Sequence, residues 1–223
     1  MPGESKSNSG SHGLTVKIIG GGNVGGTIAF ALLHSNRVKA ISITDIDRGK
    51  ERAIQMDLED AAYLTEKTIT TDGQNADITV ITAGKAQRIG QSRKSLYRAN
   101  QPVVEGYVAE LNKAKYTGRV IIITNPVDTL TQEMMNKYPG LNFIPINLQL
   151  DNVRLKVQGT TGEVIGSHDE GQTVLVNNIQ DKEATERIRQ KAQQIISGKG
   201  YTCYGIAEVV KNIIEKGQHE TGE

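Results

Sequence analysis

The stretch Leu14-Thr-Val-Lys-Ile-Ile-Gly-Gly-Gly-Asn-Val-Gly-Gly-Thr-Ile-Ala-Phe-Ala-Leu-Leu33 decides the fold. Its first six residues form an apolar run that is rich in β-branched side chains, which is typical of a buried strand. Three glycines follow at G-x-G-x-x-G spacing, at Gly20, Gly22 and Gly25. Apolar residues then recur every three or four positions up to Leu33, which predicts a helix. A strand, a glycine-rich turn and a helix in this order indicate a site for the pyrophosphate of a dinucleotide.

Each glycine has its own task in such a site. The first allows the tight turn, the second lets the backbone approach the pyrophosphate, and the third lets the helix pack closely on the strand. A second predicted strand, residues 38–45, ends in Asp45, twenty residues after Gly25. A carboxylate there binds the adenosine ribose hydroxyls and repels a 2′-phosphate, so the spacing favours NAD over NADP. A helix cap or a turn acid is the alternative for Asp45 taken alone.

Strands and helices continue to alternate after this first unit. Helices are predicted at 48–63 and 92–115, the second broken or kinked near Pro102, and strands at 68–72, 76–84 and 120–124. The last of these strands is almost wholly apolar, as in a parallel sheet that is buried on both faces. The pattern predicts an α/β fold with a Rossmann-type doubly wound parallel sheet over residues 14–140.

The remainder of the chain has a different texture. Residues 141–223 predict a partial α+β substrate domain, with helices at 151–156, 181–197 and 205–215 and a strand at 173–176 after a glycine-rich segment. Residues 1–13 are small, polar and without periodicity, which predicts a disordered tail.

Composition excludes several classes of protein. The formal net charge is +1 and no run of Lys and Arg is interleaved with aromatic residues, so a nucleic acid is not an expected partner. No apolar stretch has membrane-spanning length, so no membrane partner is expected. Cys203 is the only cysteine, which rules out an internal disulfide framework and favours a reducing, cytoplasmic location.

Seven phrases, taken together and in this order, resemble the lactate and malate dehydrogenase family. They are ITDIDRGKERAIQMDLEDA, DITVITAG, QRIGQSR, ITNPVD, LQLDNVRL, VIGSH and GKGYTCYGIA, and the resemblance runs from about Leu14 to about Glu215. It implies reversible hydride transfer between NAD and a small 2-hydroxy or 2-oxo acid. It also implies a homodimer or homotetramer, for which the helices near Arg48 and after Gly205 are candidate contacts, unless their apolar faces belong to the core.

Three residues match the family's catalytic and substrate-binding positions. A hydroxyl proton must leave as the hydride leaves, and histidine is suited to accept it near neutral pH. His168 matches the catalytic histidine, and Asp151 matches the carboxylate that holds its imidazole. Arg154 matches the arginine that binds the substrate carboxylate with two parallel hydrogen bonds. Asp151 and Arg154 would share one helix face, and a surface ion pair is the alternative for them.

Further residues match the family's substrate and cofactor positions. Arg93 matches the arginine of a loop that closes over the substrate, with Gly90 lending that loop flexibility. Gln87, three residues after Gly84, implies a substrate with an uncharged methyl side, such as pyruvate. An arginine there would pair with the second carboxylate of oxaloacetate, and a small change in the loop path could present the neighbouring Arg88 instead. We therefore favour L-lactate and pyruvate slightly over L-malate and oxaloacetate. Thr202 matches the pocket wall. The expected cofactor-binding residues are Gly20, Gly22, Asn23, Val24, Gly25, Asp45, Thr82, Ala83, Gly84 and Asn125, the last on the nicotinamide side.

Three features depart from the family pattern. Only fourteen positions separate Arg154 from His168, where the family inserts a longer helix and loop, and Ser167-His-Asp-Glu replaces Glu-His-Gly-Asp. The chain also ends at Glu223, without the family's closing strands and final helix. These departures favour, as an alternative, a truncated relative that binds NAD without turnover. A third alternative is an NAD- and metal-dependent glycosidase, but no metal site is expected, since the sequence has no Cys/His cluster with metal spacing.

Overall fold

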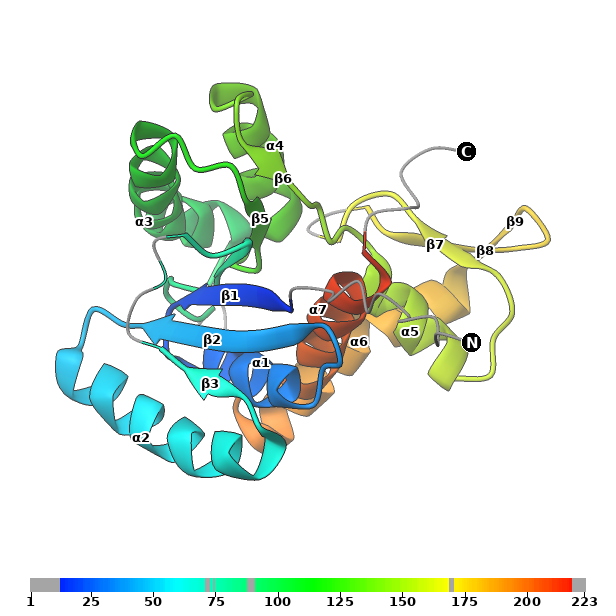
Figure 1. Ribbon diagram of the computed structural model, residues 1–223. Helices are drawn as coiled ribbons and strands as arrows, with labels where there is room; N and C mark the ends of the chain where they lie inside the picture. Colours follow the sequence, from blue (N-terminus) through cyan, green and yellow to red (C-terminus); the bar gives the residue numbers. More distant parts are fainter. Residues whose placement is uncertain (1–12, 71–72, 74, 88–90, 169–170, 218–223) are drawn as a thin grey trace, which may run out of the picture.

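The computed structural model describes residues 13–70, 73, 75–87, 91–168 and 171–217 (Figure 1). The predicted disordered tail lies outside the described residues except for Gly13, and so do Arg88 and Gly90 of the predicted substrate loop. Of the helices in the described ranges, none combines the length and the apolar character needed to cross a membrane.

Six parallel strands form the main sheet in the order β3-β2-β1-β4-β5-β6. They are β1 Leu14–Ile19, β2 Val38–Thr44, β3 Thr68–Ile69, β4 Ile78–Ile81, β5 Arg119–Ile122 and β6 Asn142–Phe143. The winding direction reverses between β1 and β4, and sheets of this kind bind ligands beyond the carboxyl ends of the strands at that point. The predicted Rossmann-type doubly wound sheet is therefore confirmed.

Helices cover both faces of this sheet (Figure 1). Helices α1 (Asn23–Leu33) and α2 (Arg48–Thr65) lie on one face, and α3 (Arg93–Lys113) and α4 (Val127–Lys137) on the other. Two apolar cores result. In the first, side chains of α1 pack on β1 and β2, whereas in the second α3 and α4 pack on Ile81 and Ile122. This double burial explains the nearly continuous apolar sequences of the central strands.

The structure refines the helix predictions in this half. Of the break or kink predicted near Pro102, the break is wrong, because α3 is one helix with Pro102 inside it. A proline inside a helix costs about 3 kcal/mol, but Leu96 and Val104, on either side of it, are fully buried and hold the helix on the sheet. Helix α4 was missed although Val127, Leu130, Thr131 and Met134 are its buried residues at i, i+3, i+4 and i+7 spacing.

The second half of the chain combines helices with a small antiparallel sheet. Its elements are α5 Gln149–Val157, β7 Glu163–Ile165, β8 Thr173–Val176, β9 Ile179–Asp181, α6 Lys182–Lys199 and α7 Tyr204–Lys216. Strands β7, β8 and β9 pair in that order, to the side of the main sheet (Figure 1). Strand β7 contains Val164 and Ile165 of the phrase VIGSH, whereas β9 was not predicted, because three residues are too few to show a period. The α+β character predicted for this half is present.

Helix α7 returns to the first half of the chain. Its residues Ala207, Val210 and Ile214 are buried in the same core as Ile28 and Leu32 of α1. The apolar face of α7 is therefore part of the core rather than a subunit contact. Strand β6 also carries the main sheet to Phe143, so the domain boundary near residue 140 stays a prediction.

Candidate active site

The turn between β1 and α1 needs glycine for packing at two of its three predicted positions. Gly20 has φ of +112°, and a Cβ on it would lie 2.6 Å from the backbone N of Ala83. A Cβ on Gly25 would lie 1.9 Å from the carbonyl oxygen of Gly20. Gly22, at the N-cap of α1, has nothing within 4 Å of its Cβ position, and no side chain caps this helix end. The turn thus leaves open space at Gly22, beside an N-terminus of α1 that no side chain caps.

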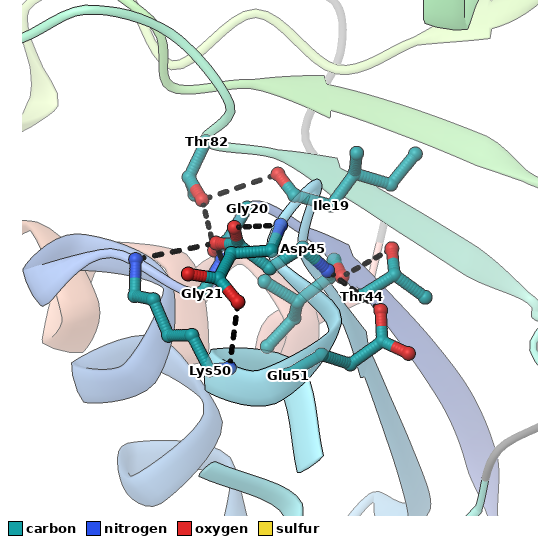
Figure 2. Close-up of polar contacts among 10 residues, drawn as sticks. Ile19, Gly20, Gly21, Thr44, Asp45, Lys50, Glu51 and Thr82 are labelled. Carbon is teal, nitrogen blue, oxygen red and sulfur yellow. Dashed lines mark hydrogen bonds and ion pairs between the residues drawn. The ribbon is translucent and has the colours of Figure 1, made fainter. Parts of the chain in front are cut away.

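Asp45 lies beside this turn, just beyond the carboxyl end of β2 (Figure 2). Its Oδ2 accepts a hydrogen bond from the backbone N of Gly21 at 2.7 Å and lies 3.3 Å from Nζ of Lys50. Its Oδ1 accepts from the backbone N of Asp47 at 3.1 Å. Burial by itself would raise the pKa of Asp45, but the hydrogen bonds from Asp47, Gly21 and Lys50 outweigh it and lower the pKa. The carboxylate is therefore ionised at neutral pH.

Threonine hydroxyls tie the strand ends at the switch point together. Oγ1 of Thr82, just after β4, donates to the carbonyl oxygen of Gly20 at 2.8 Å (Figure 2). Oγ1 of Thr124, after β5, donates to the carbonyl oxygen of Ala83 at 2.8 Å. These bonds hold the carboxyl ends of β1, β4 and β5 in register around the glycine turn.

Asn100 of α3 is a polar anchor that the sequence analysis missed. It is fully buried, and its Oδ1 accepts from the backbone N of Lys85 at 2.7 Å. Its Nδ2 donates to the carbonyl oxygens of Lys85 at 3.1 Å and Asn125 at 2.8 Å. Asn100 therefore fixes the start of the predicted substrate loop relative to Asn125. The available signal was an asparagine in the apolar stripe between Leu96 and Val104.

Asp151, Arg154 and His168 form one connected group. The side chain of Asp151 has no solvent exposure, and its Oδ2 lies 2.5 Å from Nδ1 of His168. Its Oδ1 accepts from Nη1 of Arg154 at 3.0 Å, and the Arg154 side chain is only 8% exposed, so this is not a surface ion pair. A carboxylate at Asp151 can only accept, so this contact favours the tautomer in which Nδ1 of His168 carries the proton and Nε2 is left as an acceptor.

The short interval between Arg154 and His168 still returns the histidine to Asp151. Helix α5 ends near Gly159, which has a φ of +71°. Strand β7 then runs back alongside α5, where the backbone N of Val164 donates to Oδ1 of Asn152 at 2.8 Å. His168 follows three residues after the end of β7. A turn and one short strand therefore bring His168 back to Asp151 without the longer helix and loop that the family pattern inserts.

Asp128 also touches this group, and the sequence analysis missed it. It lies in the first turn of α4, and its Oδ2 accepts from Oγ of Ser167 at 3.0 Å and from the backbone N of His168 at 2.7 Å. The only signal was its place in the phrase ITNPVD, which follows β5.

The remaining predicted residues lie on other elements. Arg93 is the first residue of α3, and Nε2 of the exposed Gln87 donates to the carbonyl oxygen of Gln91 at 3.0 Å. Asn125 is exposed, and Thr202 is half-buried between α6 and α7. Among the residues that the structure describes, no three His, Cys, Asp or Glu side chains gather as a metal site would require.

Comparison with known proteins identifies relatives over most of the chain. Residues 14–142 match the sequence model of the lactate/malate dehydrogenase NAD-binding domain. "L-lactate dehydrogenase 2" of Lactiplantibacillus plantarum is 32% identical over 225 residues, covering 86% of this chain and 73% of the relative. "L-lactate dehydrogenase" of Clostridium perfringens is 29% identical over 238 residues, covering 90% of this chain and 75% of the relative. This second alignment is longer than the 223-residue chain, so the relative carries internal segments that this chain lacks.

Solved structures share the fold. A lactate dehydrogenase, MGS-M5, from a Medee basin deep-sea metagenome library has a TM-score of 0.78 at 23% identity, covering 91% of this chain and 77% of that one. Malate dehydrogenase of Archaeoglobus fulgidus in complex with NADH has a TM-score of 0.76 at 24% identity, covering 94% of this chain and 79% of that one.

The glycine turn fits the cofactor of this family. The open space at Gly22 and the uncapped N-terminus of α1 suit a pyrophosphate, and the ionised Asp45 suits ribose hydroxyls. The domain match covers more than half of the chain, and one relative exceeds 30% identity over 86% of it. The chain therefore belongs to the lactate/malate dehydrogenase family of NAD-dependent oxidoreductases.

Proposed function

We propose that this NAD-dependent oxidoreductase of 2-hydroxy acids acts on L-lactate and pyruvate in preference to L-malate and oxaloacetate. The observation that supports the oxidation of a 2-hydroxy acid is the buried Asp151, whose two oxygens contact His168 and Arg154. One carboxylate thereby aligns a proton acceptor and a cation, as the oxidation of a hydroxy acid requires. Two relatives named L-lactate dehydrogenase support the choice of substrate.

His168 acts as the base in this mechanism. Its Nε2 accepts the hydroxyl proton of the 2-hydroxy acid and returns it to the carbonyl oxygen in the reverse direction. Asp151 keeps the Nδ1 proton in place at 2.5 Å and stabilises the imidazolium that forms. NAD, when bound, accepts the hydride or supplies it.

Arg154 and Arg93 bind the substrate. One donor of Arg154 is engaged by Asp151, which holds the guanidinium plane while its other N–H groups bind the substrate carboxylate. Arg93, at the start of α3, polarises the substrate carbonyl, and Thr202 lines the pocket. Asn125 contacts the nicotinamide side, and its backbone is anchored by Asn100.

The glycine turn and its neighbours bind the cofactor. The N–H groups at Asn23, Val24 and Gly25 would hold the pyrophosphate, because the dipole at the N-terminus of α1 favours an anion. Gly20 and Gly22 would let the backbone approach it, with Thr82, Ala83 and Gly84 at the adjoining strand end. Asp45 would bind the ribose hydroxyls.

Gln87 sets the substrate preference, and a paired turnover assay tests both this and the function. We expect NADH absorbance to fall faster with pyruvate than with oxaloacetate, and a His168→Ala variant to abolish both reactions. Replacing Gln87→Arg introduces a cation that pairs with the second carboxylate of oxaloacetate, so the preference should reverse. Faster turnover of oxaloacetate by the wild type would contradict the substrate proposal. NADH binding without turnover of either acid would favour the non-catalytic relative.

The proposal includes a homodimer or homotetramer. Helix α2 keeps large apolar side chains exposed, with Met56 at 53%, Tyr63 at 86% and Leu64 at 82% exposure. An exposed apolar patch of this kind is typical of an interaction surface. Sedimentation velocity should show a species of at least twice the 24.2 kDa chain mass, and Leu64→Glu should shift it toward the monomer. A monomer at all concentrations would refute the assembly.

A further inference from the structure

We propose that Asp128 is a positioning residue, which docks the His168 backbone onto the N-terminus of α4 through a single carboxylate oxygen. This inference rests on the proposed role of His168 in hydride transfer. The segment that carries His168 follows β7, whereas Asp128 follows β5 of the main sheet. The contact therefore joins the two halves of the site.

Two hydrogen bonds carry the proposal. Oδ2 of Asp128 accepts from the backbone N of His168 at 2.7 Å and from Oγ of Ser167 at 3.0 Å. Both donors belong to consecutive residues, so the carboxylate holds the chain at the point where the histidine side chain leaves it. The partners are forty and thirty-nine positions away in the sequence, so this is no local turn.

The contact complements the one made by Asp151. Asp151 orients the imidazole ring through Nδ1, and Asp128 holds the backbone from which the ring extends. Together they fix both ends of the His168 side chain while its Nε2 is left as an acceptor. The Asp128 carboxylate also lies in the first turn of α4, where the helix dipole favours a negative charge.

Ser167 adds a second donor to this docking. The residue before His168 is a serine here, where the resemblance described above implies a glutamate. A glutamate would carry a second negative charge toward Asp128, whereas the serine hydroxyl donates to it. The pairing of a serine at 167 with an aspartate at 128 is thus chemically matched.

Steady-state kinetics on three variants test the positioning role. Asp128→Ala removes both hydrogen bonds, and a displacement of His168 by roughly 1 Å should lower kcat about 100-fold. The affinity for NADH should be unchanged, because the glycine turn lies on other elements. Asp128→Asn should retain most of kcat, since both donors meet one oxygen and an amide oxygen also has two lone pairs. Ser167→Ala should lose less than Asp128→Ala, because the bond to the His168 backbone remains.

Glu183→Ala is the matched control. Glu183 is also a first-turn helix acid, on α6, but its side chain is 85% exposed and pairs with Arg187. Its replacement should leave kcat at the wild-type value. A wild-type kcat in Asp128→Ala would overturn the proposal. An equal loss of kcat in Asp128→Asn and Asp128→Ala would also overturn it, because the negative charge rather than the docking would then explain the loss.

Amide hydrogen exchange separates this proposal from the proposed function. The backbone N–H of His168 should be protected in the wild type and in Asp128→Asn, and unprotected in Asp128→Ala. If the wild type shows this protection but turns over neither acid, the docking stands and the proposed function fails. If the His168 amide exchanges equally fast in all three proteins, the docking is refuted whatever the activity.

Discussion

Replacing Asp151→Asn is expected to lower kcat by about 10³- to 10⁴-fold, because the asparagine favours the wrong tautomer of His168. The amide oxygen can still accept from Arg154, which turns the NH₂ group toward Nδ1 of His168. Nδ1 must then accept, so the ring proton moves to Nε2 and the base is lost. Measurement of kcat with NADH and pyruvate checks this result.

The same replacement should also destabilise the protein, by about 3–5 kcal/mol, since it leaves a buried guanidinium without its counter-charge. The side chains of Arg154 and Asp151 are 8% and 0% exposed, so solvent cannot compensate. Asp57→Asn, at an exposed position on α2, is the matched control and should change neither quantity. A variant at Asp151 that keeps kcat within about tenfold of wild type would be incompatible with a tautomer-holding carboxylate.

Replacing Gly25→Ala is expected to lower the free energy of unfolding by about 3 kcal/mol, at the upper end of the cost of overpacking. The new methyl group would meet the carbonyl oxygen of Gly20 at 1.9 Å and the hydroxyl of Thr82 at 2.8 Å. The carbonyl is backbone, so β1 and α1 must separate. That movement displaces the turn at Gly22, so NADH affinity should also fall.

Gly26→Ala is the natural control for this prediction. It is the next residue of α1, and its Cβ position has nothing within 4 Å. Alanine is favoured over glycine inside a helix by about 1 kcal/mol, so this variant should be as stable as the wild type or more so. Urea unfolding measures the stability of both alanine variants, and NADH fluorescence titration measures their affinity for the cofactor. Equal stabilities for the two alanine variants would mean that α1 does not need its close approach to β1.

The elements that the sequence predicted best are those with local signals. The strand, glycine turn and first helix all lie within residues 14–33, where periodicity and glycine spacing are visible together. Helix α4 has the same kind of signal in Val127, Leu130, Thr131 and Met134, but it begins directly after Asn125-Pro126, which was interpreted only as the end of a strand. Strands of two or three residues, such as β6, β7 and β9, are too short to show a period.

The residues of the candidate site also fall into those with a local sequence signal and those without one. The sequence by itself determined the dinucleotide turn, the acid at the end of β2 and the Asp151–Arg154 pair, since each depends on spacing within one element or its neighbour. Only the tertiary structure decided that Asp128 meets His168 across forty positions and that Asn100 joins Lys85 to Asn125. Such contacts are made between segments that packing brings together, and a polar residue shows no sign of its distant partner until the apolar faces around it are buried.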